Sequence, residues 1–484
     1  MARMVRIAIV IVWLGLMGVL LRERWTAPPP PAPLASTPAP LRAADEWLDV
    51  LHDNQKIGYV RHRATPNDDG HMFEEQSLLR LNFMNEPQTV RTIVTGQTDQ
   101  GYAMQRFTFE LSSGVGTLRV RGHVADGTLH LTMASGAEES TQTVPLKGPL
   151  YLPTTLRNFI ASSDLQAGRE ISVDVFDPSV MKNDVIHVSV ERREAVPGEP
   201  DNQQAWRIRE EFHGIRTTAW IDDTGAVVRE EGPLGLTLRR TSEHHAVYEG
   251  WATDTALDLV QTVAVPVART IENPRDIQML RVRLHGIDLD QVPSDPRQLR
   301  AGDTFTITRE NLAAAHTYPL PYTGTDHRDD LNATPLLQID HPRVREAATE
   351  AAGGEHDAVR AVQQVLNWMH GYMKQVPTVS IPNALQVLDE RQGDCNEHSV
   401  LFAALTRAIG LPTRVVAGVV YLEGAFYYHA WDEVWLGEWV AVDPTFNQFP
   451  ADPTHLKFVQ GGPEEQFEIL HVIGRLGIDV LASG

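Results

Sequence analysis

The stretch from residue 393 to residue 412, GDCNEHSVLFAALTRAIGLP, places the strongest constraint on the fold of this chain. Asp394, followed three residues later by Glu397, makes a capping box that predicts Asp394 as the N-cap and Cys395 as the first helical residue. Apolar residues then recur at helical spacing until Gly410, which predicts the end of the helix. We therefore expect a helix that carries the only cysteine of the chain at its N-terminus.

The position of Cys395 bears on its chemistry. A lone cysteine is most often a small buried hydrophobe, but the polar neighbours Asp394 and Asn396 leave little apolar burial at this end of the helix. The free N–H groups and the positive end of the helix dipole favour an anion there, so we expect a thiolate. His398, one turn away, adds only half of a metal site, and no CxxC or HExxH motif accompanies it. The sequence therefore predicts no metal and no cofactor.

Three runs of strand-forming residues follow the helix and contain one well-placed histidine and one aspartate. They are residues 413–422 (TRVVAGVVYL), 426–436 (FYYHAWDEVWL) and 439–445 (WVAVDPT). If the last two pair as a hairpin, facing positions sum to about 875, which brings His429 within diagonal reach of Asp443. A carboxylate at that place fixes the tautomer of the imidazole and stabilises its cation when His429 takes a thiol proton.

These motifs resemble the core of the transglutaminase-like superfamily, whose fold is related to that of papain-type cysteine proteases. The resemblance rests on GDCNEH, ALxRAxGLPxRVVxG, HAWxEVW and WVAVDPT, in that order, over about the last third of the chain. It implies a catalytic triad of Cys395, His429 and Asp443, an oxyanion hole that uses the Cys395 backbone N–H, and a bacterial membrane-anchored type of protein. The second oxyanion donor stays unassigned.

Length and composition limit the other possibilities. A chain of 484 residues is too long for one ordinary core, so two or three domains are expected. The 42 basic and 63 acidic side chains give a net charge of −21, which argues against nucleic acid or an anionic membrane surface as a ligand. With one cysteine the chain forms no internal disulfide, and the sequence does not specify its oligomeric state.

The N-terminal segment predicts export. Residues 7–21 form an uncharged apolar run flanked by arginines, and no small-x-small cleavage motif follows it directly. A signal anchor over residues 1–24 is therefore favoured over a cleaved signal peptide. The proline-rich residues 25–44 are typical of a semi-rigid linker. We expect a single-pass protein of the bacterial inner membrane, with the bulk of the chain in the periplasm.

The rest of the chain predicts an α+β protein. Short strand-like runs separated by turns fill residues 45–250, which indicates an antiparallel β domain in the form of a curved sheet or partial barrel. Residues 251–332 predict a small β module. From residue 333 to residue 484 the composition becomes helical before the strands near His429, as expected for the transglutaminase-like catalytic domain.

Three functions fit these expectations. The first is hydrolysis of an amide or peptide bond through a thioester at Cys395, as in a protease or amidase. The second is transamidation, in which an amine captures the same acyl group and crosslinks a peptide or protein. The third is a peptide-binding module whose triad is vestigial. In all three the partner is a peptide or protein, and hydrolysis is favoured.

Overall fold

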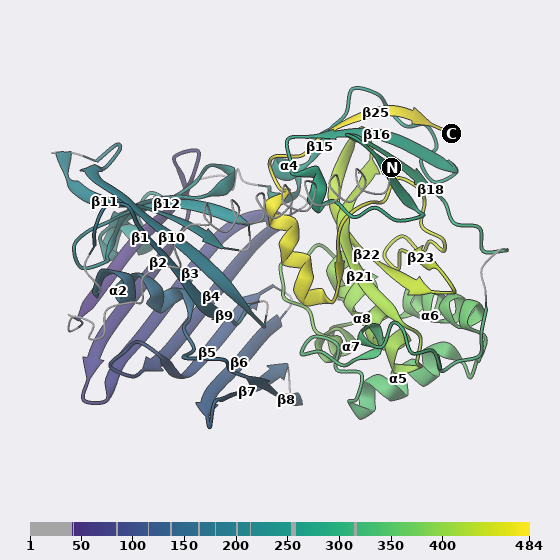
Figure 1. Ribbon diagram of the computed structural model, residues 1–484, viewed down its shortest axis with the longest axis horizontal. Coiled ribbons are helices and arrows are strands. Elements are labelled where there is room, and N and C mark those ends of the chain that lie inside the picture. The colour runs from purple at the N-terminus through teal and green to yellow at the C-terminus, as the bar shows by residue number, and fades with distance from the viewer. Residues whose placement is uncertain are drawn as a thin grey trace, which may run out of the picture.

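The computed structural model of the protein describes residues 41, 43–83, 86–114, 116–135, 138–162, 165–179, 181–199, 202–212, 214–252, 258–313 and 317–484. The predicted signal anchor and nearly all of the predicted linker lie outside these ranges. Within the described part of the chain, no helix is long and apolar enough to cross a membrane. The described residues form two parts, a large β-sheet and a mixed α/β core, which lie beside each other (Figure 1).

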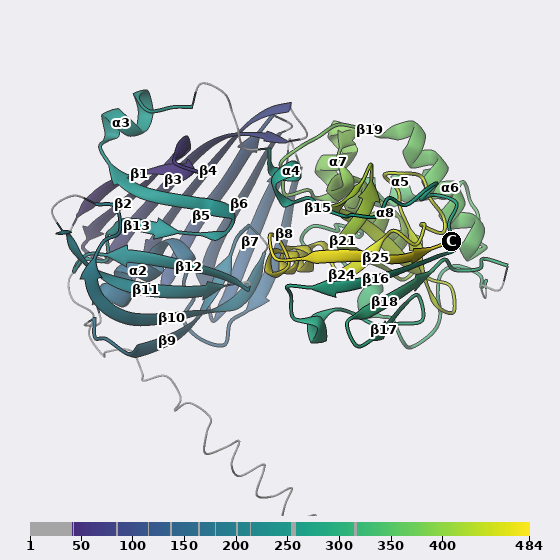
Figure 2. The same ribbon diagram turned by 90° about the horizontal axis from the view of Figure 1, so that it is seen from above.

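The N-terminal part is one antiparallel sheet of fourteen strands, which confirms the predicted antiparallel β domain. The strands follow one another as hairpins on either side of a central contact, where the first strand pairs with the last. The sheet curves strongly, as the two views show (Figures 1 and 2). Its strands are β1 (Ala44–His52), β2 (Gln55–Asn67), β3 (Gly70–Phe83), β4 (Glu86–Thr98), β5 (Met104–Ser113), β6 (Gly116–Ala125), β7 (Thr128–Ser135), β8 (Glu138–Pro145), β9 (Arg169–Asp177), β10 (Lys182–Ala195), β11 (Gln204–Phe212), β12 (Ile215–Ile221), β13 (Val227–Glu231) and β14 (Leu236–Thr241).

Alternation of side chains along these strands builds the core of the β domain. In β9, for example, Ile171, Val173 and Val175 point to one face and are buried, while the residues between them are exposed. Helix α2 (Pro153–Ser162) packs its apolar side, including Phe159 and Ile160, against this buried face. The packing of α2 closes one side of the curved sheet.

A smaller sheet connects the two parts of the sequence. It has the strand order β17 (Gln298–Ala301), β18 (Thr304–Thr308), β16 (Met279–His285) and β25 (Gly477–Ser483). Three of its strands come from the predicted small β module, and β25 comes from the predicted catalytic domain. The C-terminal strand thus returns to a sheet that begins almost 200 residues earlier in the chain.

The C-terminal core places helices against a five-stranded sheet. Helix α8 (Cys395–Ala408) is buried along nearly its whole length, between the other helices and strands β21 and β22. Its N-cap and its capping box lie where the sequence predicts them. The elements of this core are α5 (Pro342–Ala352), α6 (Ala358–Tyr372), α7 (Ala384–Glu390), β15 (Val265–Pro266), β21 (Thr413–Leu422), β22 (Ala425–Trp435), β23 (Trp439–Val442) and β24 (Leu456–Gly461).

The predicted hairpin register is confirmed to within one residue. Strand β22 pairs with β23 so that Glu433 faces Ala441, a pair of positions that sums to 874. The remaining short elements are α3 (Glu243–Tyr248), α4 (Leu259–Val263), β19 (Lys374–Gln375), β20 (Gln392–Gly393) and the 3₁₀ helices η2 (Pro233–Gly235), η3 (Leu289–Gln291), η4 (Asp329–Leu331) and η5 (Pro463–His471).

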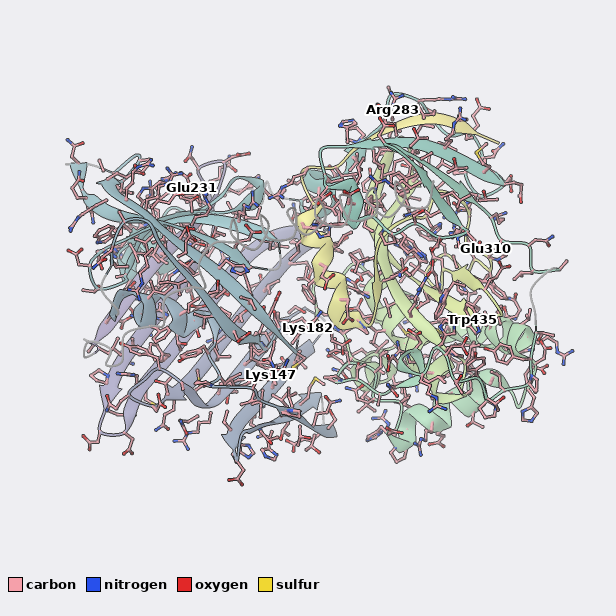
Figure 3. The ribbon with its side chains drawn as sticks, viewed as in Figure 1. Lys147, Lys182, Glu231, Arg283, Glu310 and Trp435 are labelled. Atoms are coloured by element: carbon pink, nitrogen blue, oxygen red, sulfur yellow. The ribbon has the colours of Figure 1, made fainter. Side chains whose placement is uncertain are left out.

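Helix η5 lies between the β domain and the catalytic core (Figures 1 and 2). Lys182 at the start of β10 is labelled near this boundary in Figure 3 and pairs with Glu468 at 3.3 Å and Glu465 at 3.6 Å, both on η5. At the other end of η5, the Cβ of His471 lies against Gly214, in the turn between β11 and β12. The two parts of the molecule therefore meet through this helix.

Candidate active site

Cys395 lies at the first position of α8, where the local sequence holds it in place. The side chain of Asp394 accepts the N–H of Asn396 at 2.9 Å, and Glu397 Oε2 accepts the N–H of Asp394 at 2.8 Å. These reciprocal bonds satisfy donors that a helix start leaves free. Among the described residues, the thiol of Cys395 is free and half-buried.

His429 lies in the middle of β22, opposite Gly418 of β21. Its Nε2 lies 2.8 Å from Asp443 Oδ2, so the contact expected between these two residues is present. The backbone N–H of Ala430, the next residue along β22, donates to the sulfur of Cys395. Since Asp443 occupies Nε2, the imidazole atom left to exchange a proton is Nδ1. The structure thus brings all three predicted residues together.

Asp443 follows β23 directly, and its side chain is held by the backbone of the residues that come after it. Its Oδ1 accepts the N–H groups of Thr445 and Phe446 at 2.8 and 2.9 Å, while Oδ2 faces His429. Burial raises the pKa of the Asp443 carboxyl, but the charge and N–H groups of the neighbouring imidazoles outweigh burial and hold it well below its ordinary range. Asp443 is therefore a carboxylate at any working pH.

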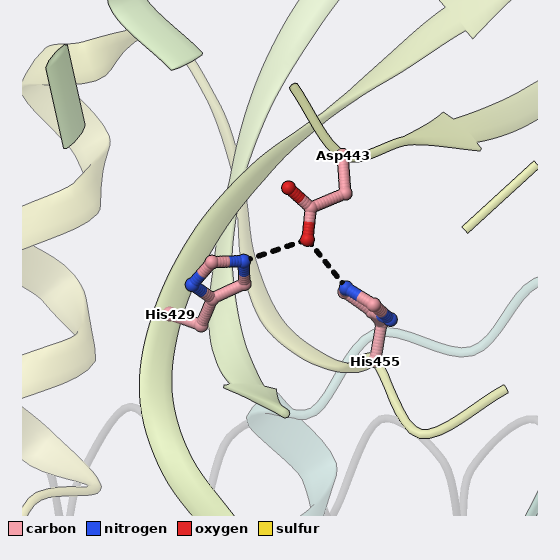
Figure 4. A group of neighbouring side chains, drawn as sticks. All are labelled: His429, Asp443 and His455. Carbon is pink, nitrogen blue, oxygen red and sulfur yellow. Dashed lines mark hydrogen bonds and ion pairs between the residues drawn. The ribbon is translucent and has the colours of Figure 1, made fainter. Parts of the chain in front are cut away.

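A second imidazole shares this carboxylate, and sequence reasoning missed it. His455 Nε2 lies 2.9 Å from the same Asp443 Oδ2 (Figure 4), and its Nδ1 lies 3.0 Å from the backbone oxygen of Asp452. His455 is fully buried. Burial lowers the pKa of its imidazole, but hydrogen bonds and charge from Asp443 and Asp452 raise it to about 9. His455 is thus a cation near neutral pH.

A signal for His455 exists in the sequence. Asp443 and Asp452 each begin an Asp-Pro-Thr tripeptide, and in each the carboxylate accepts the threonine N–H at 2.8 Å. This repeated turn brings His455, directly after the second tripeptide, back to the first. The repeated tripeptide indicates two similar turns, but it does not specify that His455 meets Asp443.

The spacing of His429, Asp443 and His455 argues for a hydrogen-bond network instead of a metal site. The three side chains form a group whose ligand atoms all lie within 4.8 Å of one another. Both imidazole nitrogens lie at hydrogen-bond distance, 2.8 and 2.9 Å, from one oxygen. Two ligands around a tetrahedral ion stand roughly 3.4 Å apart when each is about 2.1 Å from it. The observed contacts are shorter, as expected for N–H groups that donate directly to a carboxylate.

The smaller sheet supports the segment that carries Asp443 and His455. Arg297, just before β17, donates to the backbone oxygens of Ala451 and Asp452 at 3.2 and 2.9 Å. It also pairs with the buried Glu310, whose other oxygen accepts the N–H of Ala441 at 2.8 Å. The carboxylate–imidazole network therefore depends on residues that precede Asp443 by more than one hundred positions.

The thiolate expected from the helix N-terminus is not the resting form in this structure, and that expectation is corrected. Burial raises the pKa of the Cys395 thiol well above its ordinary value, and the carboxyl groups of Asp394, Glu397 and Asp443 add to the effect. The N–H donated by Ala430 opposes them without reversing the direction. Burial, together with these acids, thus outweighs the helix dipole. At neutral pH Cys395 is therefore a thiol.

Cys395 and His429 open into a cavity of about 400 Å³. Its walls come from the start of α8, from β21 and β22, from η5 with the loop after it, and from the β domain at β3, η2 and the start of β12. A cavity of this size accommodates several residues of a peptide. The cleft around Cys395 and His429 therefore belongs to both parts of the molecule.

Comparisons with known proteins agree with the C-terminal fold. Residues 345–444, which include Cys395, His429 and Asp443, match the family described as Transglutaminase-like superfamily. A segment of 76 residues is 37% identical to a protein-glutamine gamma-glutamyltransferase of Pseudomonas aeruginosa. That alignment covers 13% of this chain, and the chain spans only 11% of the length of that relative.

Two solved structures show more distant similarity. A β-barrel-like protein of the DUF1849 domain from Brucella abortus aligns with a TM-score of 0.34 and 14% identity, over 42% of this chain and 97% of that one. The periplasmic domain of TgpA from Pseudomonas aeruginosa aligns with a TM-score of 0.23 and 18% identity, over 36% of this chain and 89% of that one. The protein is thus a mixed α+β chain in which a large antiparallel sheet precedes a core whose residues 345–444 form a transglutaminase-like superfamily domain.

Proposed function

We propose that the protein is a thiol-dependent acyltransferase that acts on an amide or peptide bond of a peptide or protein, with hydrolysis as the reaction. The observation that carries the proposal is the chain's only cysteine beside an imidazole that a buried carboxylate orients at 2.8 Å. The roles that follow are nucleophile for Cys395, base and acid for His429, and orienting group for Asp443.

In the first half of the reaction, Nδ1 of His429 takes the proton of Cys395 while the sulfur attacks the amide carbonyl carbon. The raised pKa of the thiol makes this transfer part of the attack, instead of an equilibrium that precedes it. His429 then returns the proton to the departing amine as the C–N bond breaks, and a thioester remains. The N–H of Cys395, at a helix start, is the donor available for the oxyanion.

In the second half, water attacks the thioester carbonyl and gives its proton to His429. The C–S bond breaks, the acid leaves, and His429 returns the proton to the sulfur. Every proton that His429 takes up is returned within the cycle, so this chemistry needs no cofactor. Asp443 stays ionised throughout and stabilises the imidazolium in both halves.

Transamidation is the second candidate, and one observation favours it. The 76-residue match is to a protein named as a protein-glutamine gamma-glutamyltransferase. In that reaction a primary amine replaces water in the second half and a crosslink or modified amide forms. The two candidates share the thioester and differ only in the acceptor.

One experiment separates these functions. The full chain is incubated with a digest of casein peptides in H₂¹⁸O, with and without a biotin-labelled alkylamine, and the products are analysed by mass. Hydrolysis places one ¹⁸O in each new carboxylate, whereas transamidation adds the mass of the amine and releases ammonia or a peptide amine. Absence of both products would refute the proposal and favour the peptide-binding module.

Variants assign the roles within this assay. Cys395→Ala and His429→Ala are each expected to lower the rate by roughly a thousandfold or more. His244→Ala is the matched control for His429→Ala, because His244 has 73% of its side chain exposed and lies on α3. Equal rates in the wild type and Cys395→Ala would show that the thiol is not the nucleophile.

We also propose that residues 1–24 hold the protein at the bacterial inner membrane, with the folded part in the periplasm. The apolar run at 7–21 and the proline-rich segment after it support this arrangement. Sequencing the N-terminus of the protein isolated from membranes tests the proposal. A mature N-terminus near residue 27 would show a cleaved signal peptide instead of an anchor.

A further inference from the structure

The lining of the active-site cleft has an unusual charge composition for so acidic a protein. The chain carries a net charge of −21, yet the described residues that line the cleft include no lysine, arginine or glutamate. Asp394 is the single acid among them, and its carboxyl group accepts the N–H of Asn396 at the helix start at 2.9 Å. A substrate next to Cys395 therefore meets a nearly uncharged surface.

Apolar side chains from distant parts of the sequence form most of this surface. The β domain contributes Phe83, Ile215 and Leu234, and the segment of η5 and the loop after it contributes Phe467 and Leu470. Strands β21 and β22 and helix α4 add further apolar residues on the side of Cys395. The catalytic core alone supplies only part of the apolar wall.

Leu234 shows that the wall is held in a specific shape. Its backbone lies in the left-handed region, with φ 56° and ψ 26°, a conformation that a leucine rarely adopts. Its side chain lies against Gly474 in the loop after η5, where an added Cβ would stand 2.8 Å from Leu234 Cδ2. The surrounding contacts thus fix a strained residue with an apolar side chain at the boundary of the cleft.

We infer that the acyl group bound beside Cys395 carries an aliphatic or aromatic side chain, and that the β domain selects it through Phe83, Ile215 and Leu234. This inference rests on the proposed function, since it assigns the substrate class of the same site. An apolar side chain gains by leaving water for these walls. A charged side chain loses its hydration and finds no partner of opposite charge, which costs far more than an imperfect apolar fit.

The test uses peptidyl chloromethyl ketones of the form acetyl-Ala-Ala-X, with X as Leu, Phe, Glu or Lys. The sulfur of Cys395 displaces chloride from the probe, a C–S bond forms as the C–Cl bond breaks, and the thiol proton is lost to His429 or solvent. Because the chain has one cysteine, intact mass of the full chain counts the labelled sites without ambiguity. Each rate is divided by the rate with iodoacetamide, which has no side chain to recognise.

The Leu and Phe probes are expected to label Cys395 about tenfold faster, or more, than the Glu and Lys probes. Leu234→Asn should reduce this preference by roughly three- to tenfold, since asparagine tolerates the left-handed backbone while removing the apolar contact. Leu299→Asn is the matched control, because Leu299 is 57% exposed on β17 and does not line the cleft. Phe83→Ala is the second variant if Leu234→Asn lowers the melting temperature.

Equal normalised rates for the four probes, or a preference that survives both Leu234→Asn and Phe83→Ala, would overturn the inference. A preference that Leu299→Asn reduces equally would overturn it as well. The labelling reports on the cleft and the thiol without turnover. A clear preference for Leu and Phe together with no hydrolysis or transamidation would therefore refute the proposed function alone, whereas turnover without preference would refute only this inference.

Discussion

The shared carboxylate predicts a pH-dependent stability that can be assigned to one residue. The pKa of His455 rises from 6.5 to about 9 in the folded protein, which is worth roughly 3 kcal/mol at about 1.4 kcal/mol per pH unit. The folded state binds this proton more tightly than the unfolded state. The stabilisation is therefore fully present below pH 6.5, falls as the pH rises, and is gone above pH 9.

Denaturation of the full chain in urea, followed by tryptophan fluorescence at pH 6, 7.5, 9 and 10, measures this effect. The wild type should lose roughly 3 kcal/mol across the series through His455, in addition to the changes common to all variants. His455→Gln removes the proton-binding site and should be less stable at pH 6, because it leaves Asp443 with one donor fewer in a buried place. Between pH 6 and pH 10 this variant should therefore lose roughly 3 kcal/mol less stability than the wild type does.

The control for this comparison is His244→Gln, an exposed histidine outside the core. Its pH dependence should equal that of the wild type. If His455→Gln and the wild type lose stability in parallel between pH 6 and pH 10, the imidazole of His455 does not bind a proton as the geometry requires. The account of Asp443 as a carboxylate between two imidazoles would then be wrong.

Three further predictions follow from other contacts. Because the pKa of Cys395 is raised, its alkylation by iodoacetamide, measured by intact mass, should be slow at pH 7. The rate should still increase above pH 9. A rate that already reaches its plateau at pH 7 would contradict the raised pKa. Gly418→Ala should lower both the activity and the melting temperature. A Cβ at this position would stand 2.1 Å from the backbone oxygen of Leu456 and 2.6 Å from the ring of Trp431. Unchanged values would contradict the close packing opposite His429. Lys457→Met should lower the free energy of unfolding, measured in urea, by roughly 3–5 kcal/mol. The substitution removes the buried ammonium group that lies 2.5 Å from Asp295 and 2.8 Å from Glu433. A loss below about 1 kcal/mol would instead be the size expected for an exposed ion pair.

The parts of the structure that the sequence predicts are those governed by local signals. The start of α8 follows from the capping box of Asp394 and Glu397, and the contact between His429 and Asp443 follows from the length of one hairpin. The catalytic roles of these residues stay predictions. The predicted thiolate form of Cys395 was wrong chiefly because burial raises the pKa of the thiol, and the carboxyl groups of Asp394, Glu397 and Asp443 add to that effect.

Long-range contacts were not predictable in this way. His455 meets Asp443 because two Asp-Pro-Thr turns follow each other, and Arg297 fixes the second turn from a different sheet. The cleft wall formed by Phe83 and Leu234 depends on how a fourteen-stranded sheet packs against η5. No period or motif in the sequence specifies such a meeting of surfaces.

The order of the segments along the chain has a consequence for when activity can arise. All three triad residues have been synthesised by residue 443, but η5 (Pro463–His471) and β25 (Gly477–Ser483) come later. A nascent or truncated chain that ends before residue 463 thus holds a complete set of reactive groups without one wall of the cleft and without the strand that closes the smaller sheet. Its cleft would keep the part of the apolar wall that the β domain supplies and would lack the part that η5 supplies. The cleft around Cys395 is therefore complete only after these C-terminal segments have been made and have folded back against the earlier parts of the chain.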